Sequence, residues 1–310
     1  MRRAEQLITQ IRRQTENVKI GISDGIDDEE FLQYLNDGQD AIYGAIMQAN
    51  AKAFAKVHYI DSVRGTPAYD LAADIYLRSR VICVEYSPTG LEKDFYKLEK
   101  RVTTEKIFTE GVPRSYHIQT GQLVISSVPE RSVTRGFRVT YDPILPRLDK
   151  RRTTVSAVTT LGGAVTALTL ATASPFSAAD YTLFDHLSFV DSFGNLKCAG
   201  LHFSAVNSGT GVVTISGSSH TLAEGETITN GDYVLLGKRA TTTCQLPDSC
   251  ESYLLAYGAM RIFARDSSTD IGDQAQVVSS LAETIISNFQ DTSGDTEEVP
   301  VYDYDYYPEC

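Results

Sequence analysis

The stretch DKRRTTVSAVTTLGGAVTALTLATAS, residues 149–174, divides the chain into two kinds of sequence. From residue 150 to about residue 243 the chain is rich in Thr, Ser, Gly, Ala and Val, and turns such as LGG, SFGN, NSGTG and TNGD recur. Short strands separated by glycine turns are typical of small all-β barrels and sandwiches. The predicted strands are TTVSAVTT, AVTALTLAT, HLSFVDS, LHFSAVN, GVVTISG, ETI and YVLLG, within residues 153–237.

Two helices are predicted before this region. The segment LITQIRRQTENV, residues 7–18, has its apolar residues at helical spacing and leaves a basic face exposed. Asp27 is the predicted N-cap of a second helix over residues 28–57, because acidic residues fill the first turn that follows it. Gly38 and Gly44 weaken this helix and favour close packing against another one. Its apolar stripe consists of Phe31, Leu32, Leu35, Ile42, Ile46 and Met47.

The spacing of apolar residues changes after residue 57. From there on, segments in which apolar and polar residues alternate predict strands. The segment SYHIQTGQLVISSVPE, residues 115–130, is a predicted hairpin that turns at QTGQ, and RGFRVTYDPIL, residues 135–145, alternates again.

Helical spacing returns after residue 247. One helix is predicted within residues 249–266, and another, capped by Ser268 or Thr269, within residues 268–291. Their apolar faces are Tyr253, Leu254, Tyr257, Met260, Ile262 and Phe263, then Ile271, Val277, Val278, Leu281, Ile285 and Phe289. Because neither pair of helices can bury its stripe alone, the two ends of the chain must meet.

The predicted fold class is therefore α+β. A helical bundle with a β-hairpin region, formed by the N- and C-terminal segments, carries an inserted small all-β barrel or sandwich domain. The predicted boundaries are residues 1–149 and 244–291 for the helical domain, 150–243 for the insertion and 292–310 for an acidic, tyrosine-rich arm.

Charge and hydropathy exclude several classes of protein. The formal net charge is −12, so the chain does not gain the counterion release that drives duplex binding. A passive channel around DNA remains compatible with this charge. No apolar run approaches the roughly 18 residues of a membrane span, and the N-terminus lacks the apolar core of a signal peptide. We expect synthesis in the cytoplasm and no membrane partner.

Residues that carry chemistry are scattered. The five cysteines, at positions 83, 198, 244, 250 and 310, form no CxxC pair, and ordinary reduced thiols are favoured over a zinc site at Cys244 and Cys250. No two of the five histidines show ligand spacing, and His202 alternates with apolar residues like a sheet-surface or satisfied core histidine. There is no GxSxG, P-loop or GxGxxG motif. We assign no catalytic, metal-binding or cofactor-binding residue and predict no cofactor and no enzymatic activity.

Two charged segments remain. Lys150, Arg151 and Arg152 follow Asp149 at the join between the predicted domains. A phosphate site is one hypothesis, and a linker or inter-subunit salt-bridge patch is the favoured one. In the arm EEVPVYDYDYYPEC, residues 297–310, alternation places Tyr302, Tyr304 and Tyr306 on one face of an extended strand. A disordered solubilising segment is the alternative.

Four segments, in this order, resemble the tailed-bacteriophage head-to-tail adaptor (connector, head-completion) family. They are ISDGIDDEEFLQYLNDGQDAIYGAIM (22–47), GTPAYDLAADIY (65–76), YHIQTGQLVISSVPERSVTRGFRVTYDPILPRL (116–148) and LPDSCESYLLAYGAMRIFARD (246–266). The chain departs from the family pattern in two ways: AYDLAAD lacks the family's proline, and the β insertion replaces a short connection.

The resemblance implies a structural virion protein at the head–tail junction. Members form a dodecameric ring beneath the portal, with a central channel that double-stranded DNA traverses without specific binding. The implied partners are further copies of the chain, the portal protein and tail or tail-fibre proteins. By the same resemblance the C-terminal arm docks on the portal through Val301, Tyr302, Asp303, Tyr304, Asp305, Tyr306 and Tyr307.

Two other functions are weighed against this one. A tail-associated binding module would recognise a glycan or host surface through the β insertion, which requires an aromatic surface patch. The available aromatics are Tyr181, Phe184, Phe189, Phe193, Phe203 and Tyr233, most of which alternate as core residues do. An enzyme, such as a peptidoglycan hydrolase, lacks any acid/base constellation.

Overall fold

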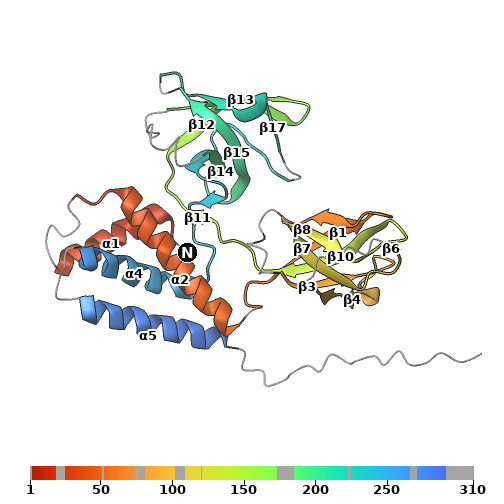
Figure 1. Ribbon diagram of the computed structural model, residues 1–310. Coiled ribbons are helices and arrows are strands. Elements are labelled where there is room, and N and C mark those ends of the chain that lie inside the picture. The colour runs from red at the N-terminus through yellow and green to blue at the C-terminus, as the bar shows by residue number, and fades with distance from the viewer. Residues whose placement is uncertain are drawn as a thin grey trace, which may run out of the picture.

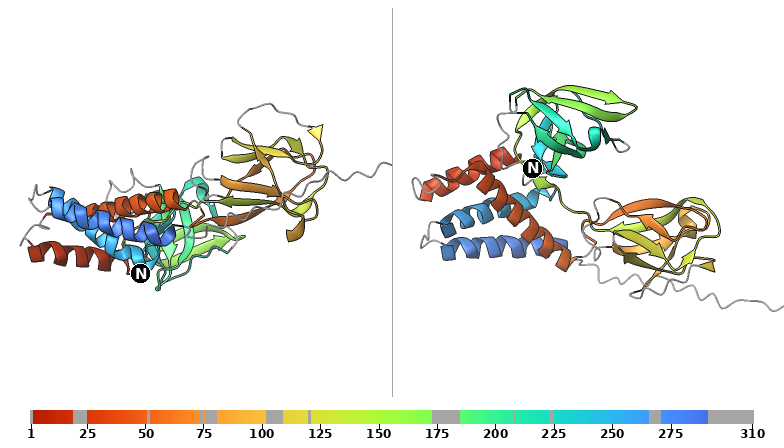
Figure 2. Two further views of the ribbon diagram at one scale, coloured as in Figure 1. Left: turned by 90° about the horizontal axis from the view of Figure 1, so that it is seen from below. Right: turned by 45° about the horizontal axis from the view of Figure 1, so that its top comes forward.

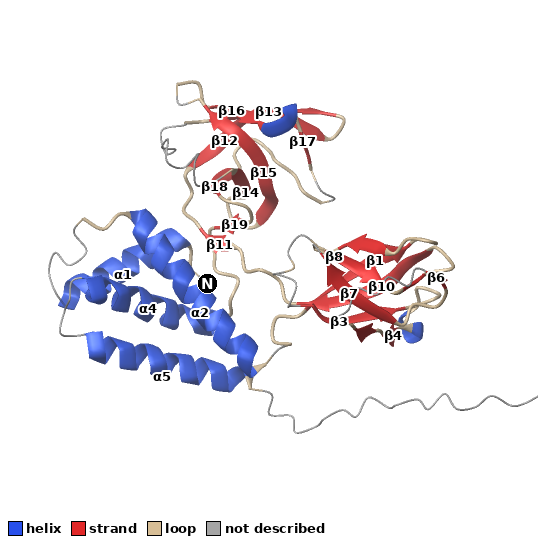
Figure 3. Cartoon of the chain, viewed as in Figure 1, coloured by secondary structure: helices blue, strands red, loops and turns tan. Residues whose placement is uncertain are grey.

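The computed structural model of the chain shows three modules, each with its own core (Figures 1 and 3). It describes residues 2–18, 25–50, 52–72, 75, 81–101, 109–119, 121–172, 185–207, 209–222, 225–265 and 271–290. We call the parts the helical module, the two-sheet module and the barrel module. The α+β class with an inserted barrel is confirmed, whereas the predicted domain boundaries stay predictions.

The helical module joins the two ends of the described chain. It consists of α1 (Ala4–Val18), α2 (Asp28–Ala49), α4 (Glu251–Arg265) and α5 (Ile271–Phe289). Residues from all four helices share one core, in which Ile11, Phe31 and Leu254 are fully buried. Burial of each such side chain contributes about 1.5–3 kcal/mol. The prediction that the terminal helices meet is therefore confirmed.

Helix boundaries follow local side-chain hydrogen bonds. The predicted cap is confirmed, because Asp27 accepts the N–H of Glu30 at 2.8 Å at the start of α2. The predicted end of this helix at residue 57 is wrong, since α2 ends at Ala49. There Asn50 adopts extended backbone and its Oδ1 accepts the N–H of Lys52 at 2.9 Å, so a turn replaces the helix.

The predicted apolar faces are buried or partly buried against one core, except at Val277. Val277 on α5 is 47% exposed and does not belong to the buried stripe. The predicted caps Ser268 and Thr269 and the arm residues 301–307 lie outside the described residues.

The two-sheet module spans residues 56–142. One sheet has the order β1–β10–β3–β4, and the other has the order β2–β8–β7–β5. The strands of the first sheet are β1 (Lys56–Ser62), β10 (Val133–Tyr141), β3 (Val81–Tyr86) and β4 (Tyr96–Lys97). Those of the second are β2 (Ala68–Asp70), β8 (Gln122–Ile125), β7 (Ser115–Gln119) and β5 (Glu99–Lys100). The β7–β8 hairpin confirms the predicted one.

Both sheets contribute to one core, in which Phe137 of β10 contacts Tyr69 of β2 at a ring separation of 4.9 Å. Beside them, β6 (Thr109–Glu110) pairs with β9 (Ser127–Val128), and a 3-10 turn spans Glu92–Asp94.

The barrel module closes through six strands in the order β12–β18–β14–β15–β16–β13, with β13 pairing back onto β12. These strands are β12 (Thr153–Leu161), β13 (Ala164–Leu170), β14 (His186–Val190), β15 (Leu196–Val206), β16 (Val212–Ile215) and β18 (Tyr233–Leu236). The short β17 (His220–Thr221) adds to β13 after a 3-10 turn at Ser216–Ser218. The predicted strand ETI is wrong, because residues 226–228 form no ladder and instead contact β15 through single hydrogen bonds, from the Thr227 N–H to the Lys197 carbonyl and from the Ala199 N–H to Glu226.

A bulge in β15 determines which side chains face the barrel core. Leu201 pairs with Leu187, but Ala199 pairs with Ser188, so Gly200 is the extra residue. Its φ of +134° favours glycine. Cys198 and Leu201 are consequently both buried, although they are three residues apart.

The two β modules form separate lobes beside the helices (Figure 2). The two-sheet module follows the C-terminal end of α2, and the barrel is reached through β11 (Arg147–Leu148) and left through β19 (Ala240–Thr241). A 3-10 turn, Asp248–Cys250, then leads into α4. Among the described helices none has the length and hydropathy needed to cross a membrane.

Candidate functional site

A row of buried polar side chains on α2 holds the strand that leads into the barrel. Asn36, Gln39 and Tyr43 share one helix face, and each is at most 8% exposed. Asn36 donates to the carbonyl of Leu148 at 3.0 Å and accepts the Leu148 N–H at 2.8 Å. Gln39 donates to the carbonyl of Pro146 at 2.9 Å, and the Tyr43 hydroxyl donates to that of Pro143 at 2.7 Å. The linker backbone is therefore satisfied by the helix.

The strand that leaves the barrel completes this layer. β11 and β19 pair in parallel, with Leu148 opposite Thr241. The backbone of Ala4, at the start of α1, donates to the carbonyl of Thr242 at 2.8 Å. The Cys244 thiol donates to Gln39 at 3.0 Å. Segments that are distant in sequence thus meet at a single joint, which we define as α2, the start of α1, residues 143–152 and residues 234–244.

A buried ion pair lies at the centre of the joint. The Arg152 guanidinium donates to Asp149 at 3.0 and 3.1 Å and to Glu29 of α2 at 2.7 Å. The Arg152 and Asp149 side chains are only 4% and 6% exposed. Asp149 also accepts the N–H of Leu236 in β18 at 2.7 Å. Burial favours loss of the Arg152 charge, but Asp149 and Glu29 outweigh it and raise the pKa of Arg152.

The other two basic residues of DKRR bind the neighbouring helices. Lys150 lies 3.2 Å from Asp28 and from Glu29. Arg151 donates to Glu5 of α1 at 2.8 Å, and its guanidinium lies 4.8 Å from the centre of the Tyr233 ring. All three cations therefore pair with carboxylates of the same chain. This favours the linker interpretation over a phosphate site, since no cation of the patch is left without a carboxylate.

One cavity at the joint is lined without acid/base groups other than cations. A cavity of about 450 Å³ lies where the three modules meet, between Phe54, Pro146 and Leu196. Its described lining includes Lys56 and Arg239 but no carboxylate, histidine or cysteine. Its described lining thus offers two cations beside apolar and neutral polar side chains.

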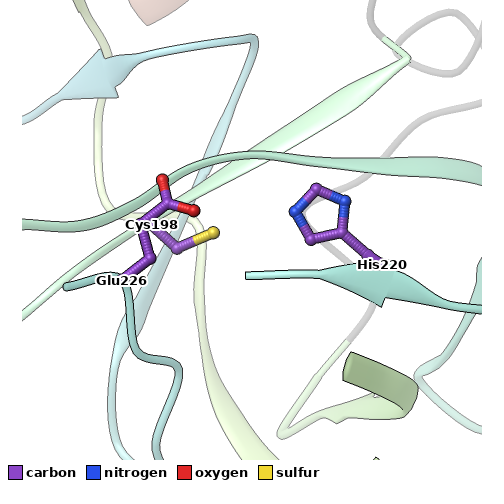
Figure 4. Close-up of side chains that lie close together, drawn as sticks. All are labelled: Cys198, His220 and Glu226. Carbon is purple, nitrogen blue, oxygen red and sulfur yellow. The ribbon is translucent and has the colours of Figure 1, made fainter. Parts of the chain in front are cut away.

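A second cluster lies in the barrel, where Cys198 of β15, His220 of β17 and Glu226 converge (Figure 4). One ligand atom from each side chain lies within 4.8 Å of the other two. In Figure 4 the sulfur faces the imidazole, with the carboxylate beside the sulfur. Glu226 is positioned by the N–H of Ala199, which donates to it at 2.9 Å. Sulfur, imidazole nitrogen and carboxylate oxygen form a donor set that suits a divalent metal.

The electrostatics of the cluster oppose ionisation of the thiol. Burial, and then the charge of Glu226, raise the pKa of Cys198 to about 12. Burial also lowers the pKa of His220, although the charge of Glu226 opposes this; His186 and His202 nearby add smaller lowering effects. Without a cation the thiol of the cluster therefore stays protonated at neutral pH.

Sequence reasoning did not find this cluster. Its members are 22 and 6 residues apart along the chain and lie on separate segments, so no ligand spacing marks them. His202 lies on the sheet surface, which was one of the two predicted alternatives for this residue. Its ring stacks on that of His186, with the ring centres 4.9 Å apart. Cys244 and Cys250 are both buried, and burial raises the pKa of each thiol.

The aromatics of the insertion do not form a surface patch among the described residues. Phe189 and Phe203 are core residues, Tyr233 lies under Arg151, and Phe193 alone is highly exposed, at 80%. Tyr181 and Phe184 lie outside the described ranges.

No protein-family model matches the chain, and no curated protein matches it.

Proposed function

We propose that this chain is a structural protein of a tailed-bacteriophage particle, which forms a ring between portal and tail and extends the DNA channel. The ordered resemblance to head-to-tail adaptors is the starting point. The observation that carries the proposal is the joint, in which buried hydrogen bonds and an ion pair fix the barrel lobe against a helical body.

A rigid multi-lobed subunit suits assembly by complementary surfaces. In a closed ring each copy must present the same two surfaces at a fixed angle, so movement between lobes would prevent closure. The joint opposes such movement, because both strands that enter and leave the barrel are bound to α2 or α1. The net charge of −12 suits a channel that passes DNA without retaining it.

The C-terminal arm is the proposed contact with the portal. The tyrosines of the arm offer large contact areas at low entropic cost; they are Tyr302, Tyr304, Tyr306 and Tyr307. The alternation of tyrosine with aspartate suits a strand that adds to the edge of a partner's sheet.

Co-sedimentation with a purified portal protein tests the proposal. We expect the full-length chain to sediment with the portal and a chain lacking residues 292–310 to bind it much more weakly. If the full-length chain does not bind, the adaptor proposal is contradicted. If both chains bind equally, the role of the arm alone is contradicted.

The alternative of a glycan-binding module requires aromatic surface area on the barrel. The described aromatics give that reading little support, since only Phe193 among them is highly exposed.

A further inference from the structure

Three ligand types converge in the barrel from three separate segments. Cys198 comes from β15, His220 from β17, and Glu226 from the segment that follows β17 (Figure 4). Thiolate, imidazole and carboxylate are the ligands that zinc takes in proteins. We propose that Cys198, His220 and Glu226 bind one Zn²⁺ ion, with a water molecule in the fourth position.

The distances allow this with small movements. Ligand bonds of about 2.0–2.3 Å in a tetrahedron place ligand atoms roughly 3.3–3.8 Å apart. The three atoms already lie within 4.8 Å of one another, so a shift of about 1 Å is sufficient. His220 and Glu226 are half-buried, whereas the core and the Gly200 bulge hold Cys198 in place.

A divalent cation also resolves the unfavourable electrostatics. A buried thiol beside a carboxylate stays protonated when no cation is present, which is why burial and Glu226 raise the pKa of Cys198. A bound metal reverses this preference and deprotonates the coordinating thiol. On binding, the Sγ–H bond breaks, a Zn–S bond forms and one proton passes to solvent.

Neighbouring titratable groups are not part of the ligand set. Asp185 lies 2.6 Å from Nδ1 of His186, and the rings of His186 and His202 stack on each other. His202 is therefore a suitable control, because it is a nearby histidine on the same barrel that we place outside the site.

The ion would stabilise a weakly attached part of the barrel. β17 has only two residues and pairs with β13 alone, and residues 226–229 contact β15 through a few hydrogen bonds. Coordination would tie both segments to Cys198. This role does not depend on ring formation or on the portal.

Titration of the metal-free full-length protein with Co²⁺ tests the proposal, because thiolate–cobalt charge transfer gives a near-ultraviolet band. We expect one equivalent to produce the band, Zn²⁺ to displace it, and thermal unfolding to shift upward with Zn²⁺. Calorimetric titration with Zn²⁺ in buffers of different ionisation enthalpy should show release of about one proton.

Matched variants locate the site. His220→Gln replaces a half-buried side chain, so we expect the variant to fold. It should weaken Zn²⁺ binding beyond the roughly 10–100-fold typical of outer-shell changes. Cys198→Ser should abolish the charge-transfer band, whereas His202→Gln and Cys83→Ser should leave it unchanged. Absence of the band, or equal Zn²⁺ affinity in His220→Gln and the unaltered protein, would overturn the proposal.

Discussion

Asn36 of α2 and Leu148 of β11 form a two-way hydrogen-bonded pair across 112 residues of sequence, in which one side-chain amide satisfies both backbone groups of the leucine. Both residues are almost completely buried, at 5% and 2% exposure. The pair fixes the register between the helical module and the strand that enters the barrel, because no other position of the strand presents both groups to Asn36.

Asn36→Ala should therefore destabilise the protein by about 1–3 kcal/mol, since it leaves the Leu148 N–H buried without its acceptor. Asn288→Ala, on the exposed face of α5, is the matched control and should change stability by no more than about 0.5 kcal/mol. Urea denaturation measures both. Equal effects of the two substitutions would contradict the importance of the pair.

Arg152→Met should lower the free energy of unfolding by more than Asn36→Ala does, by about 3–5 kcal/mol. The substitution leaves the Asp149 carboxylate buried with the Leu236 N–H as its one remaining donor among the described residues. Arg151→Met, at the adjacent position, removes a partly exposed pair with Glu5 and should cost about 1 kcal/mol or less. Restoration of most of the lost stability by a second substitution, Asp149→Asn, would confirm the mechanism. No restoration would contradict it.

The Arg152→Met variant should also gain stability relative to the unaltered protein as the pH falls. Burial raises the pKa of Asp149, and the variant lacks the arginine that opposes this. The folded variant then binds the proton more tightly than the unfolded chain, so its free energy of unfolding rises as the pH falls through that raised pKa toward 3.8. Denaturation at a series of pH values measures the difference in free energy of unfolding between the variant and the unaltered protein. If this difference does not change with pH, the explanation is contradicted.

Glu5 should give the opposite pH dependence. Burial alone would raise its pKa, but the hydrogen bonds and charge of Arg151 outweigh burial and lower the pKa below 4.5. The ionised form then stabilises the folded chain above pH 4.5, by about 1 kcal/mol at this partly exposed site, and the contribution is lost as the pH falls through the lowered value. Glu5→Gln should abolish this acid-dependent loss. If the free energy of unfolding of Glu5→Gln depends on pH as that of the unaltered protein does, the stabilising role of the Glu5–Arg151 pair is contradicted.

The two glycines of α2 should respond in opposite directions to alanine. A Cβ at Gly38 would lie 2.9 Å from Cδ1 and 3.2 Å from Cγ of Tyr257, so Gly38→Ala should push α4 away and destabilise by about 1–3 kcal/mol. A Cβ at Gly44 meets nothing within 4 Å, so Gly44→Ala should stabilise by up to about 1 kcal/mol through helix propensity. Thermal unfolding distinguishes them, and destabilisation by both would contradict the packing argument.

The parts of the fold that follow local periodicity were predictable from sequence. The Asp27 cap, the β7–β8 hairpin and most of the barrel strands are examples. The close approach at Gly38 was predicted, whereas Gly44 has no such neighbour.

The remaining features depend on contacts that no local pattern encodes. Buried Asn36 and Gln39 resemble ordinary polar helix residues until the linker is placed against them. Cys198 points inward only because Gly200 forms a bulge, and its neighbours His220 and Glu226 come from other segments. Likewise, apart from the neighbouring Asp149, the acidic partners of Lys150, Arg151 and Arg152 lie on α1 and α2, more than a hundred residues away.

Electron microscopy of the purified full-length protein, alone and mixed with a portal protein, tests the central claim most directly. The account predicts closed rings with an open central channel, alone or on the portal, in which each copy carries its two β lobes at a constant angle. A monomer that forms no ring and does not bind the portal would contradict it.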